Sequence, residues 1–310
     1  MIRNHMTNLD KKKSPAILVL IYWSIILSLG GFRSDHLMIG LLILVLWYTG
    51  KPLRKLFNFL LPLILTGIIY DSQRFYSDYI RGPVHVAEPY NLEKFLFGIS
   101  TTNGLQTPNE WFQLHTNAIL DLITGLAYII FVPVFVITAA CFSFYLSRKG
   151  TKKFPANKIA TLAPAVMWSF FWVNMVGFST YYWYAAAPPW YVALYGLGPA
   201  RMDATANAAG CVRFDQILGT HFFDEWYGRS ADVFGAIPSL HVAYPLIAVF
   251  FAFKFGALRT PSVLFYLIMC FAAVYLNHHY IIDVILGTAY GLAAALILNW
   301  CYERKNRIPT

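Results

Sequence analysis

Two short polar clusters interrupt segments of the chain that are otherwise apolar. The first is "PSLH", Pro238 to His241, and the second is "HHYIID", which ends at Asp283. His279 and Asp283 are four residues apart, so on a helix they would be neighbours on one face. A carboxylate beside an imidazole fixes the tautomer of the ring and leaves its other nitrogen unprotonated, which would make His279 a positioned nucleophile or base. Alternatively, Asp283 is a capping residue in the first turn of a helix.

The first cluster offers a matching acid. Pro238 and Ser239 suit the start of a helix, and the free amides of a first helical turn form an anion site, so a phosphate bound at Ser239 would lie close to His241. If His279 attacked phosphorus, His241 would protonate the leaving oxygen, a contribution of about 10²–10⁴ in rate. The two clusters therefore predict phosphoryl transfer through a phosphohistidine. His278 points elsewhere on the helix and is expected to be structural.

The elements that must position these residues are membrane helices. Of the 310 residues, 58% are hydrophobic and only 13% are charged, whereas about a quarter are charged in a soluble domain. Apolar segments long enough to cross a hydrocarbon core of about 30 Å recur along the whole length. The first, 16–29, follows three lysines but no A-x-A-like cleavage site follows it, which favours a retained helix over a signal peptide. We predict an all-α, multi-pass integral membrane protein without a soluble domain.

Charge sets the predicted topology. We expect about eight spans, the second of them short enough to be re-entrant, near residues 16–31, 37–50, 55–71, 118–147, 158–183, 238–256, 261–277 and 279–301. With the N-terminus inside, the inner segments hold 17 of the 24 basic residues and two acidic ones, and the outer segments hold seven basic and eleven acidic residues. The net charges are then +15 inside and −4 outside. The positive-inside rule therefore favours two cytoplasmic termini.

This topology divides one membrane domain, 1–310, into N-terminal helices (1–71), an outer loop (72–117) and catalytic helices (118–301) that carry a second outer loop (184–237). Both loops are too long for simple connections and are expected to be ordered caps or binding loops. His241 and His279 fall at the outer ends of their helices, so they can meet in one layer on the periplasmic or lumenal side. Ionisable residues at such a depth mark a functional site.

Several classes of function are disfavoured. The four cysteines give no disulfide framework, because three lie in predicted spans. No C-x-x-C or His-rich run indicates a metal, and we expect no cofactor. The basic residues gather on one side of the membrane, which favours a membrane surface over nucleic acid as their partner. A proton-coupled transporter would show ionisable residues at several depths and inverted repeats, and neither is apparent.

At these clusters the chain resembles the type 2 phosphatidic acid phosphatase superfamily, whose pattern has a P-S-x-H segment and, further on, an H-x-x-x-D segment. The resemblance implies a six-helix core, with His279 as nucleophile, Asp283 as its orienting group and His241 as general acid. Lipid phosphatases of that superfamily usually also carry K-x₆-R-P and an S-R pair. This sequence has no R-P dipeptide, and the S-R positions are Ala272 and Ala273.

These departures are typical of one branch. The segments "VNMVGFSTYYWYAAAPPWY" (173–191), "CVRFDQILG" (211–219), "FGAIPSLH" and "YLNHHYIIDVILG" resemble the inositol phosphorylceramide synthases of fungi, over about residues 118–291. The resemblance implies transfer of phosphoinositol from phosphatidylinositol, the phospholipid donor, to the primary hydroxyl of ceramide, the sphingolipid acceptor, with release of diacylglycerol in the outer or lumenal leaflet. The alternative is a lipid phosphate phosphatase, in which water is the acceptor.

Further residues are predicted to bind the substrate. Arg213 matches the branch's R-x-D segment, and its guanidinium suits phosphate oxygens; an ordinary loop salt bridge explains it as well. Asp215 and Asp203 are expected to bond inositol hydroxyls. Asn174 lies near the outer half of its helix. Asp121 lines the pocket or bonds a neighbouring helix.

Overall fold

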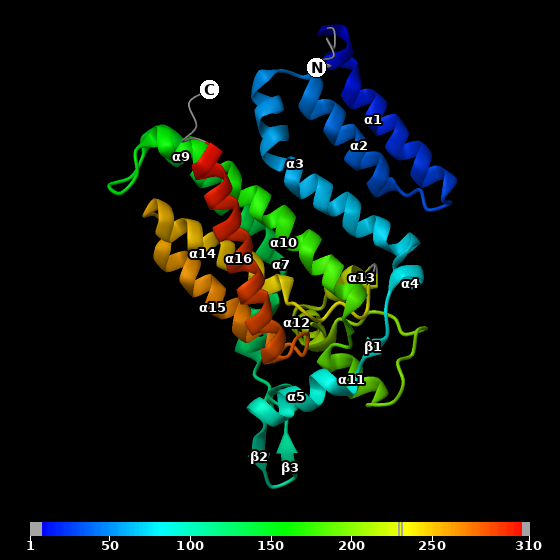
Figure 1. The fold of residues 1–310 in the computed structure, drawn as a ribbon. Coiled ribbons are helices and arrows are strands. Elements are labelled where there is room, and N and C mark those ends of the chain that lie inside the picture. The colour runs from blue at the N-terminus through cyan, green and yellow to red at the C-terminus, as the bar shows by residue number, and fades with distance from the viewer. Residues whose placement is uncertain (1–7, 229, 231, 306–310) are drawn as a thin grey trace. The chain divides into compact units, whose positions relative to one another are not determined.

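The protein is a helical membrane protein, described here by a computed structural model of residues 8–228, 230 and 232–305 (Figure 1). Arg3, Arg229 and Arg307, which enter the charge count above, lie outside these residues. The chain divides into two units, 1–65 and 66–310, and each is described by itself.

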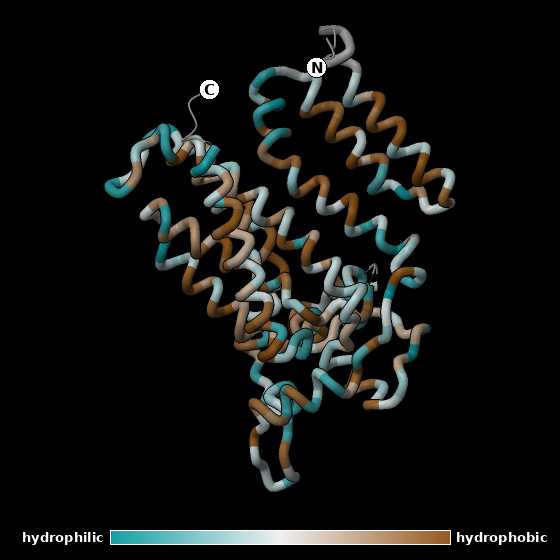
Figure 2. Tube along the Cα trace, viewed as in Figure 1, coloured by the Kyte–Doolittle hydropathy of each residue, from teal (hydrophilic) through white to brown (hydrophobic). Residues whose placement is uncertain are grey.

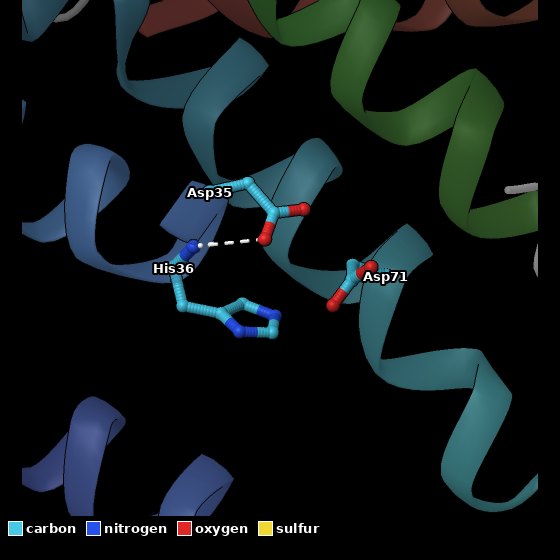
Figure 3. Close-up of side chains that lie close together, drawn as sticks. All are labelled: Asp35, His36 and Asp71. Carbon is cyan, nitrogen blue, oxygen red and sulfur yellow. Dashed lines mark hydrogen bonds between the residues drawn. The ribbon is translucent and has the colours of Figure 1, made fainter. Parts of the chain in front are cut away.

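The first unit is built from α1 (Asn8–Ser28), α2 (Ser34–Tyr48) and most of α3 (Lys51–Ser72). The indole Nε1 of Trp23 in α1 donates to the backbone oxygen of His36 at 2.9 Å, which ties α1 to the start of α2. Asp35 pairs with Arg33. It also accepts the backbone N–H of His36 at 3.2 Å (Figure 3), which is one of the amides that a helix start leaves unpaired.

The second unit begins with the last turns of α3 and continues with the segment between α3 and α7. This segment contains a 3₁₀ turn η1 (Gln73–Phe75), α4 (Ser77–Ile80), β1 (Val84–His85), α5 (Ala87–Phe97), the hairpin β2 (Ile99–Thr101) and β3 (Gly104–Gln106), and α6 (Pro108–Leu114). It is the first predicted outer loop, and it is folded. Thr107 and Glu110 form a capping box at the start of α6.

The remaining elements form the helix bundle and a second folded segment. They are α7 (Ala118–Ala140), continued by a π-helical stretch η2 (Cys141–Leu146) and α8 (Ser147–Lys149), then α9 (Ala156–Leu162), α10 (Pro164–Trp183), β4 (Ala185–Ala186), α11 (Pro189–Tyr195), η3 (Ala209–Cys211), α12 (Val212–Leu218), α13 (Phe222–Tyr227), α14 (Leu240–Phe255), α15 (Arg259–Tyr275) and α16 (Ile281–Lys305). All eight predicted helices are therefore found as helices.

Four of the described helical stretches are long and apolar enough to cross a membrane: Lys51–Phe75, Ala118–Lys149, Ala156–Trp183 and Ile281–Lys305. The other four predicted spans correspond to shorter apolar helices. Hydrophobic residues dominate the helices, while hydrophilic residues gather between α8 and α9 (Figure 2). A membrane protein is confirmed, and eight spans with cytoplasmic termini stay a prediction.

Helices α14 and α16 approach each other most closely at two glycines. A Cβ at Gly287 would lie 2.1 Å from the backbone oxygen of Ser239, and one at Gly291 would lie 2.7 Å from that of Ala243. This G-x-x-x-G spacing lets backbones pack directly, as in other membrane helix pairs. The backbone N–H of Ser239 also donates to the oxygen of Asp283 at 3.0 Å. The first turns of α14 and α16, which carry the two polar clusters, are therefore side by side.

The two folded segments that are predicted to lie on the outer side meet at a short parallel pair of strands. Val84 of β1 is paired with Ala185 of β4, and His85 with Ala186. Ala186 in turn forms a β-bridge with Gly235, just before the "PSLH" cluster. Helices α5 and α11 and the β2–β3 hairpin lie at the end of the bundle where α16 begins (Figure 1). The segments predicted to be ordered caps thus lie at the end that holds the polar clusters.

Candidate active site

The two predicted histidines are in direct contact. Nδ1 of His241 lies 3.1 Å from Nε2 of His279, and Nδ1 of His279 lies 2.9 Å from the carbonyl oxygen of Ala236. A carbonyl oxygen only accepts, so these partners assign the proton of a neutral His279 to Nδ1. Its Nε2 then has a free lone pair that accepts a hydrogen bond from His241. The geometry provides an unprotonated nitrogen beside an N–H donor.

The turn before α16 explains how His279 is presented. Asn277, two residues after the end of α15, has its backbone in the left-handed region, at φ 62°. Asparagine tolerates this conformation well. The N–H of Asn277 donates to the oxygen of Val274, and that of His278 to the oxygen of Ala273, which together form a Schellman motif. The two consecutive histidines that follow therefore leave the helix and turn to different partners.

One expectation about this turn is wrong. His279 was expected on a helix together with Asp283, but α16 begins only at Ile281. His279 lies in the five-residue connection 276–280 before it, because the Schellman motif ends α15 at Tyr275. The two side chains still approach each other, with Nδ1 of His279 3.5 Å from Oδ2 of Asp283.

Asp283 makes both of the contacts that were predicted as alternatives: it caps a helix and it faces His279. It is completely buried, and its Oδ2 accepts the N–H of Tyr280 at 2.9 Å, so it caps the first turn of α16. The same oxygen faces His279 at the longer ion-pair distance. Nδ1 of His279 makes its shorter hydrogen bond to the carbonyl oxygen of Ala236, which accepts. The tautomer of His279 is therefore set by a backbone carbonyl as well as by the carboxylate.

A column of stacked rings fixes the plane of His241. Tyr128 of α7 stacks on His241 with 4.7 Å between ring centroids, and on its other side approaches His278 at 5.4 Å. Tyr227 then stacks on His278 at 4.6 Å. Phe131 packs against His241 as well, at 4.9 Å. Sequence reasoning missed Tyr128 and Phe131, because an aromatic residue in an apolar helix carries no signal that separates it from lipid-facing surface.

His278 has the structural contacts predicted for it. Its Nε2 lies 3.1 Å from the carbonyl oxygen of Ala208 and 3.4 Å from Sγ of Cys211, inside the second outer segment. Burial lowers the pKa of His278 to about 3, so its ring stays neutral at physiological pH. His278 therefore anchors the turn and faces away from His279's partner Ala236.

Ser239 lies where the sequence placed it, at the start of α14. It is fully buried, and among the described residues its Oγ has no hydrogen-bond partner. Since a buried hydroxyl normally has a partner, this atom is suited to a polar group of a bound substrate.

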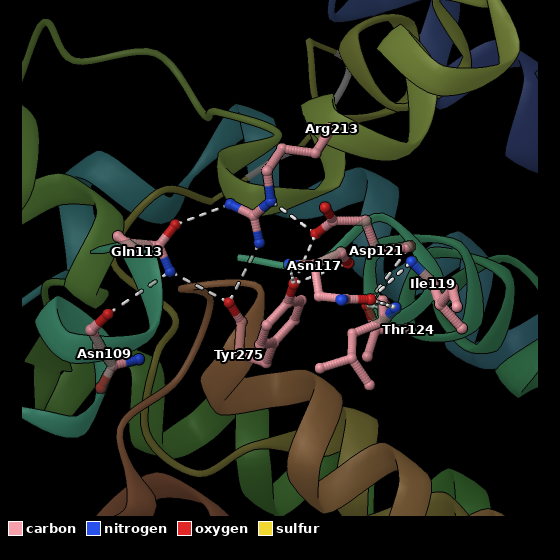
Figure 4. Close-up of polar contacts among 9 residues, drawn as sticks. Asn109, Gln113, Asn117, Ile119, Asp121, Thr124, Arg213 and Tyr275 are labelled. Atoms are coloured by element: carbon pink, nitrogen blue, oxygen red, sulfur yellow. Dashed lines mark hydrogen bonds and ion pairs between the residues drawn. The ribbon is translucent and has the colours of Figure 1, made fainter. Parts of the chain in front are cut away.

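Arg213 and Asp121 form an ion pair within the protein (Figure 4). Nε of Arg213 donates to Oδ1 of Asp121 at 2.6 Å, and its other nitrogens reach Oε1 of Gln113 and the backbone oxygen of Tyr275, at 2.9 and 3.5 Å. The hydroxyl of Tyr275 donates to the same carboxylate at 2.9 Å. These contacts join α12 to α6, α7 and α15; phosphate binding by Arg213 stays a prediction.

The other predicted substrate-binding residues have local partners. Asn174 is buried between α10 and α14, where its Oδ1 accepts the hydroxyl of Tyr244 at 2.6 Å. Asp215 is buried and accepts the N–H of Phe223, and Asp203 is exposed and pairs with Arg201. Within the described part of 66–310, no three metal-ligating side chains gather closely enough to hold an ion.

An apolar groove of about 270 Å³ runs along α7, α14 and α15. Its lining includes Phe131, Phe135 and Thr138 of α7, Ala248 of α14 and Phe265 of α15. Because the ring of Phe131 also packs against His241, the groove extends to the neighbourhood of the histidine pair. Its lining is almost entirely apolar, which suits a hydrocarbon chain better than a polar group.

Comparison with known proteins supplies the family. The sequence model of the PAP2 superfamily matches residues 105–297, which include both histidines. The chain is 39% identical over 296 residues to a phosphoinositol dihydroceramide synthase of Bacteroides thetaiotaomicron, covering 94% of this chain and 93% of that protein. No solved structure matches it.

Two fungal relatives are longer. The chain is 27% identical to the inositol phosphorylceramide synthase catalytic subunit of Schizosaccharomyces pombe over 94% of its own length and 63% of that protein. For the Saccharomyces cerevisiae catalytic subunit the identity is 28%, over 74% of this chain and 53% of the relative. The family match, these relatives and the assembled histidine motifs agree: the chain is an enzyme of the PAP2 superfamily and belongs to its inositol phosphorylceramide synthase branch.

Proposed function

We propose that the enzyme moves phosphoinositol from phosphatidylinositol to the primary hydroxyl of a ceramide-type lipid, through a phosphohistidine on His279. The observation that carries this proposal is the 3.1 Å contact between Nδ1 of His241 and Nε2 of His279. It joins an unprotonated ring nitrogen to a proton donor in a site that is almost closed to solvent, since His279 is only 5% exposed.

In the first step, Nε2 of His279 attacks phosphorus and the bond from phosphorus to the glycerol oxygen breaks. His241 acts in its imidazolium form: the leaving oxygen takes one of its two N–H protons, the ring becomes neutral, and diacylglycerol departs. The phosphorylated imidazole is cationic, because Nδ1 keeps its proton. Asp283 at 3.5 Å and the Ala236 oxygen at 2.9 Å are placed to stabilise that charge.

In the second step, the acceptor hydroxyl attacks phosphorus and gives its proton to His241. The bond between phosphorus and Nε2 breaks, and His279 returns to its starting state. The buried Oγ of Ser239 is our first candidate for a phosphate contact. Arg213 would bind phosphate only by exchanging some of its present partners.

The identity of the acceptor separates a transferase from a phosphatase. Water would have to reach a buried His279 beside a half-buried His241, whereas the apolar groove beside Phe131 offers a path for the chains of a lipid acceptor. Exclusion of water protects a reactive intermediate from hydrolysis. The named activities of the bacterial and fungal relatives support the same choice, and the charge distribution supports catalysis on the outer side.

The test is an assay of the detergent-purified protein with phosphatidylinositol labelled in the inositol ring. Ceramide, dihydroceramide and diacylglycerol are supplied in turn, and a new inositol-containing sphingolipid with an equal amount of diacylglycerol is expected. Because a relative is named a phosphoinositol dihydroceramide synthase, dihydroceramide is the first acceptor to try. Release of free inositol phosphate without a lipid product would contradict the proposal and favour water as acceptor.

A further inference from the structure

The chain on either side of His279 is held by side chains from the first outer segment. Glu93 of α5 is fully buried. Its Oε1 accepts the N–H of Ile281 at 2.9 Å and its Oε2 accepts the N–H of Ile282 at 3.1 Å. One carboxylate thus pairs two of the amides that begin α16, directly after the nucleophile.

Asn109 of α6 holds the other side of the turn. It is 1% exposed, and its Nδ2 donates to the carbonyl oxygens of Val274 and of His279 itself, both at 3.0 Å. Gln113, one helical turn further, donates to the oxygen of Tyr275 at 3.1 Å. All of these bonds join residues more than 160 positions apart in the sequence, so they fix tertiary rather than local structure.

We propose that Glu93 and Asn109 are positioning residues for the transfer, because together they clamp the backbone of the nucleophile turn from its outer side. Only the nucleophilic role of His279 is taken over from the proposed function. Neither residue touches the reacting atoms; each acts through the backbone. A displacement of about 1 Å at a reacting centre costs about 10²-fold in rate, so the clamp contributes to catalysis beyond its share in stability.

Ionisation of Glu93 is part of this arrangement. A carboxylate can accept from both amides, whereas the protonated acid has one oxygen that must donate. Burial raises the pKa of Glu93 to about 7, and the nearby Asp283 of α16 adds to the shift. Tyr280 also faces this pocket, with Tyr90 and Glu110 nearby. As the pH falls through 7, Glu93 takes up a proton and the clamp loosens.

Glu93→Gln separates this role from a purely structural one. We expect kcat for the inositol transfer to fall about 10–10²-fold while KM for both lipids changes little. Glutamine cannot take up the proton that Glu93 takes up near pH 7, so kcat should fall less between about pH 8 and about pH 6 in Glu93→Gln than in the wild type. An unchanged kcat, or an equal fall of kcat over this pH range, would overturn the proposal.

Stability should respond in the opposite sense. The folded pKa of Glu93, about 7, lies above its ordinary value of 4.5, so the folded protein holds this proton more tightly than the unfolded chain, and stability is lost as the pH rises from 4.5 to about 7. A purely structural Glu93 would make activity follow stability and decline over this range, whereas the clamp requires activity to rise over it. Glu88→Gln is the matched control, because Glu88 lies on the same helix with 62% of its side chain exposed; this variant should keep wild-type kinetics.

Hydrogen exchange tests the clamp without any substrate. Amides of 277–285 should exchange at least about tenfold faster in Glu93→Gln and in Asn109→Ala than in the wild type and in Glu88→Gln. If the wild-type protein fails the lipid assay but the exchange rates rise as expected, the proposed function is wrong and the clamp stands. Unchanged exchange rates in both variants would contradict the clamp proposal, whatever the lipid assay shows. Asn109→Ala carries the test if Glu93→Gln does not fold.

Discussion

At the scale of single residues, the hydrogen bond between the two histidines has two roles. It leaves Nε2 of His279 as the nitrogen that attacks phosphorus in the proposed mechanism, and it also occupies that nitrogen, because His241 donates to the same lone pair. On this mechanism a bound substrate has to replace the bond before the reaction begins, and the phosphorus atom inserts between the two nitrogens.

The two histidines should differ in their effects when each is replaced. His279→Ala should abolish turnover and phosphoenzyme formation, since no other nucleophile is provided. His241→Ala should slow phosphoenzyme formation by about 10²–10⁴-fold, the usual contribution of a general acid. Rapid quenching with radiolabelled phosphatidylinositol measures both. His115→Ala, at an exposed histidine that stacks on Trp111, is the control, and wild-type rates in both test variants would end the two-histidine mechanism.

His278 should affect the pH dependence of stability. Its folded pKa of about 3 lies below the ordinary value of 6.5, so the unfolded chain binds the proton first and stability is lost as the pH falls below 6.5. His278→Gln keeps an N–H for the Ala208 oxygen but does not titrate. We expect its Tm, measured in detergent, to fall less between pH 7 and pH 5 than that of the wild type. Parallel Tm curves would contradict the assignment of a neutral, buried His278.

At the scale of elements, the pairing of α14 with α16 decides whether the two histidines meet. The backbone of Ser239 lies directly against Gly287 and bonds Asp283. One helix pair therefore carries the proposed acid, His241, on one member and the proposed orienting carboxylate, Asp283, on the other. Any change that separates these helices moves His241 away from His279.

Gly287→Ala tests this pairing. Its Cβ would lie 2.1 Å from a backbone oxygen, which cannot move without its helix. Overpacking of this kind costs about 1–3 kcal/mol, and we expect a lower Tm together with at least a tenfold loss of transfer. Gly67→Ala in α3 is the matched control, because nothing lies within 4 Å of its added Cβ. Wild-type activity in Gly287→Ala would show that the close approach is dispensable.

The sequence predicted the helices and the catalytic core well, and the physical reason is locality. The length of an apolar segment and the turn residues at its ends predict a helix from the segment's own sequence, and all eight predicted helices are present. The two histidines were expected together because their spans end at the same depth. The partners that complete the site, Ala236, Glu93 and Asn109, could not be predicted, because a backbone carbonyl or a lone polar residue in a long loop has no pattern.

Arg213 shows a related limit, because its residue type alone left two roles open. Its side chain suited either phosphate or a salt bridge, and only the three-dimensional arrangement places Asp121 2.6 Å from it. The start of α16 was also placed two residues too early, since the Schellman motif at Asn277 depends on one backbone angle. Spacing identified the chemistry, and tertiary contacts decided which atoms carry it.

At the scale of the whole molecule, the predicted orientation in the membrane can be measured. Asn103, between β2 and β3, lies on the predicted outer side, and Lys152, between α8 and α9, on the predicted inner side. In a Cys301→Ser background, which removes the exposed native cysteine, a membrane-impermeant maleimide applied to whole cells or sealed right-side-out vesicles should label Asn103→Cys and spare Lys152→Cys until the membrane is opened. Labelling of both from one side would refute the eight-span topology.

The position of Glu93 also affects where the catalytic unit begins. The family match starts at residue 105 and includes His241, His279 and Asp283, so a shortened enzyme designed from shared sequence would be cut there. Such a cut keeps every atom that reacts and discards the carboxylate that holds Ile281 and Ile282. On the clamp proposed above, the smallest working version of this enzyme includes the hydrogen bonds of Glu93 and so reaches at least to α5.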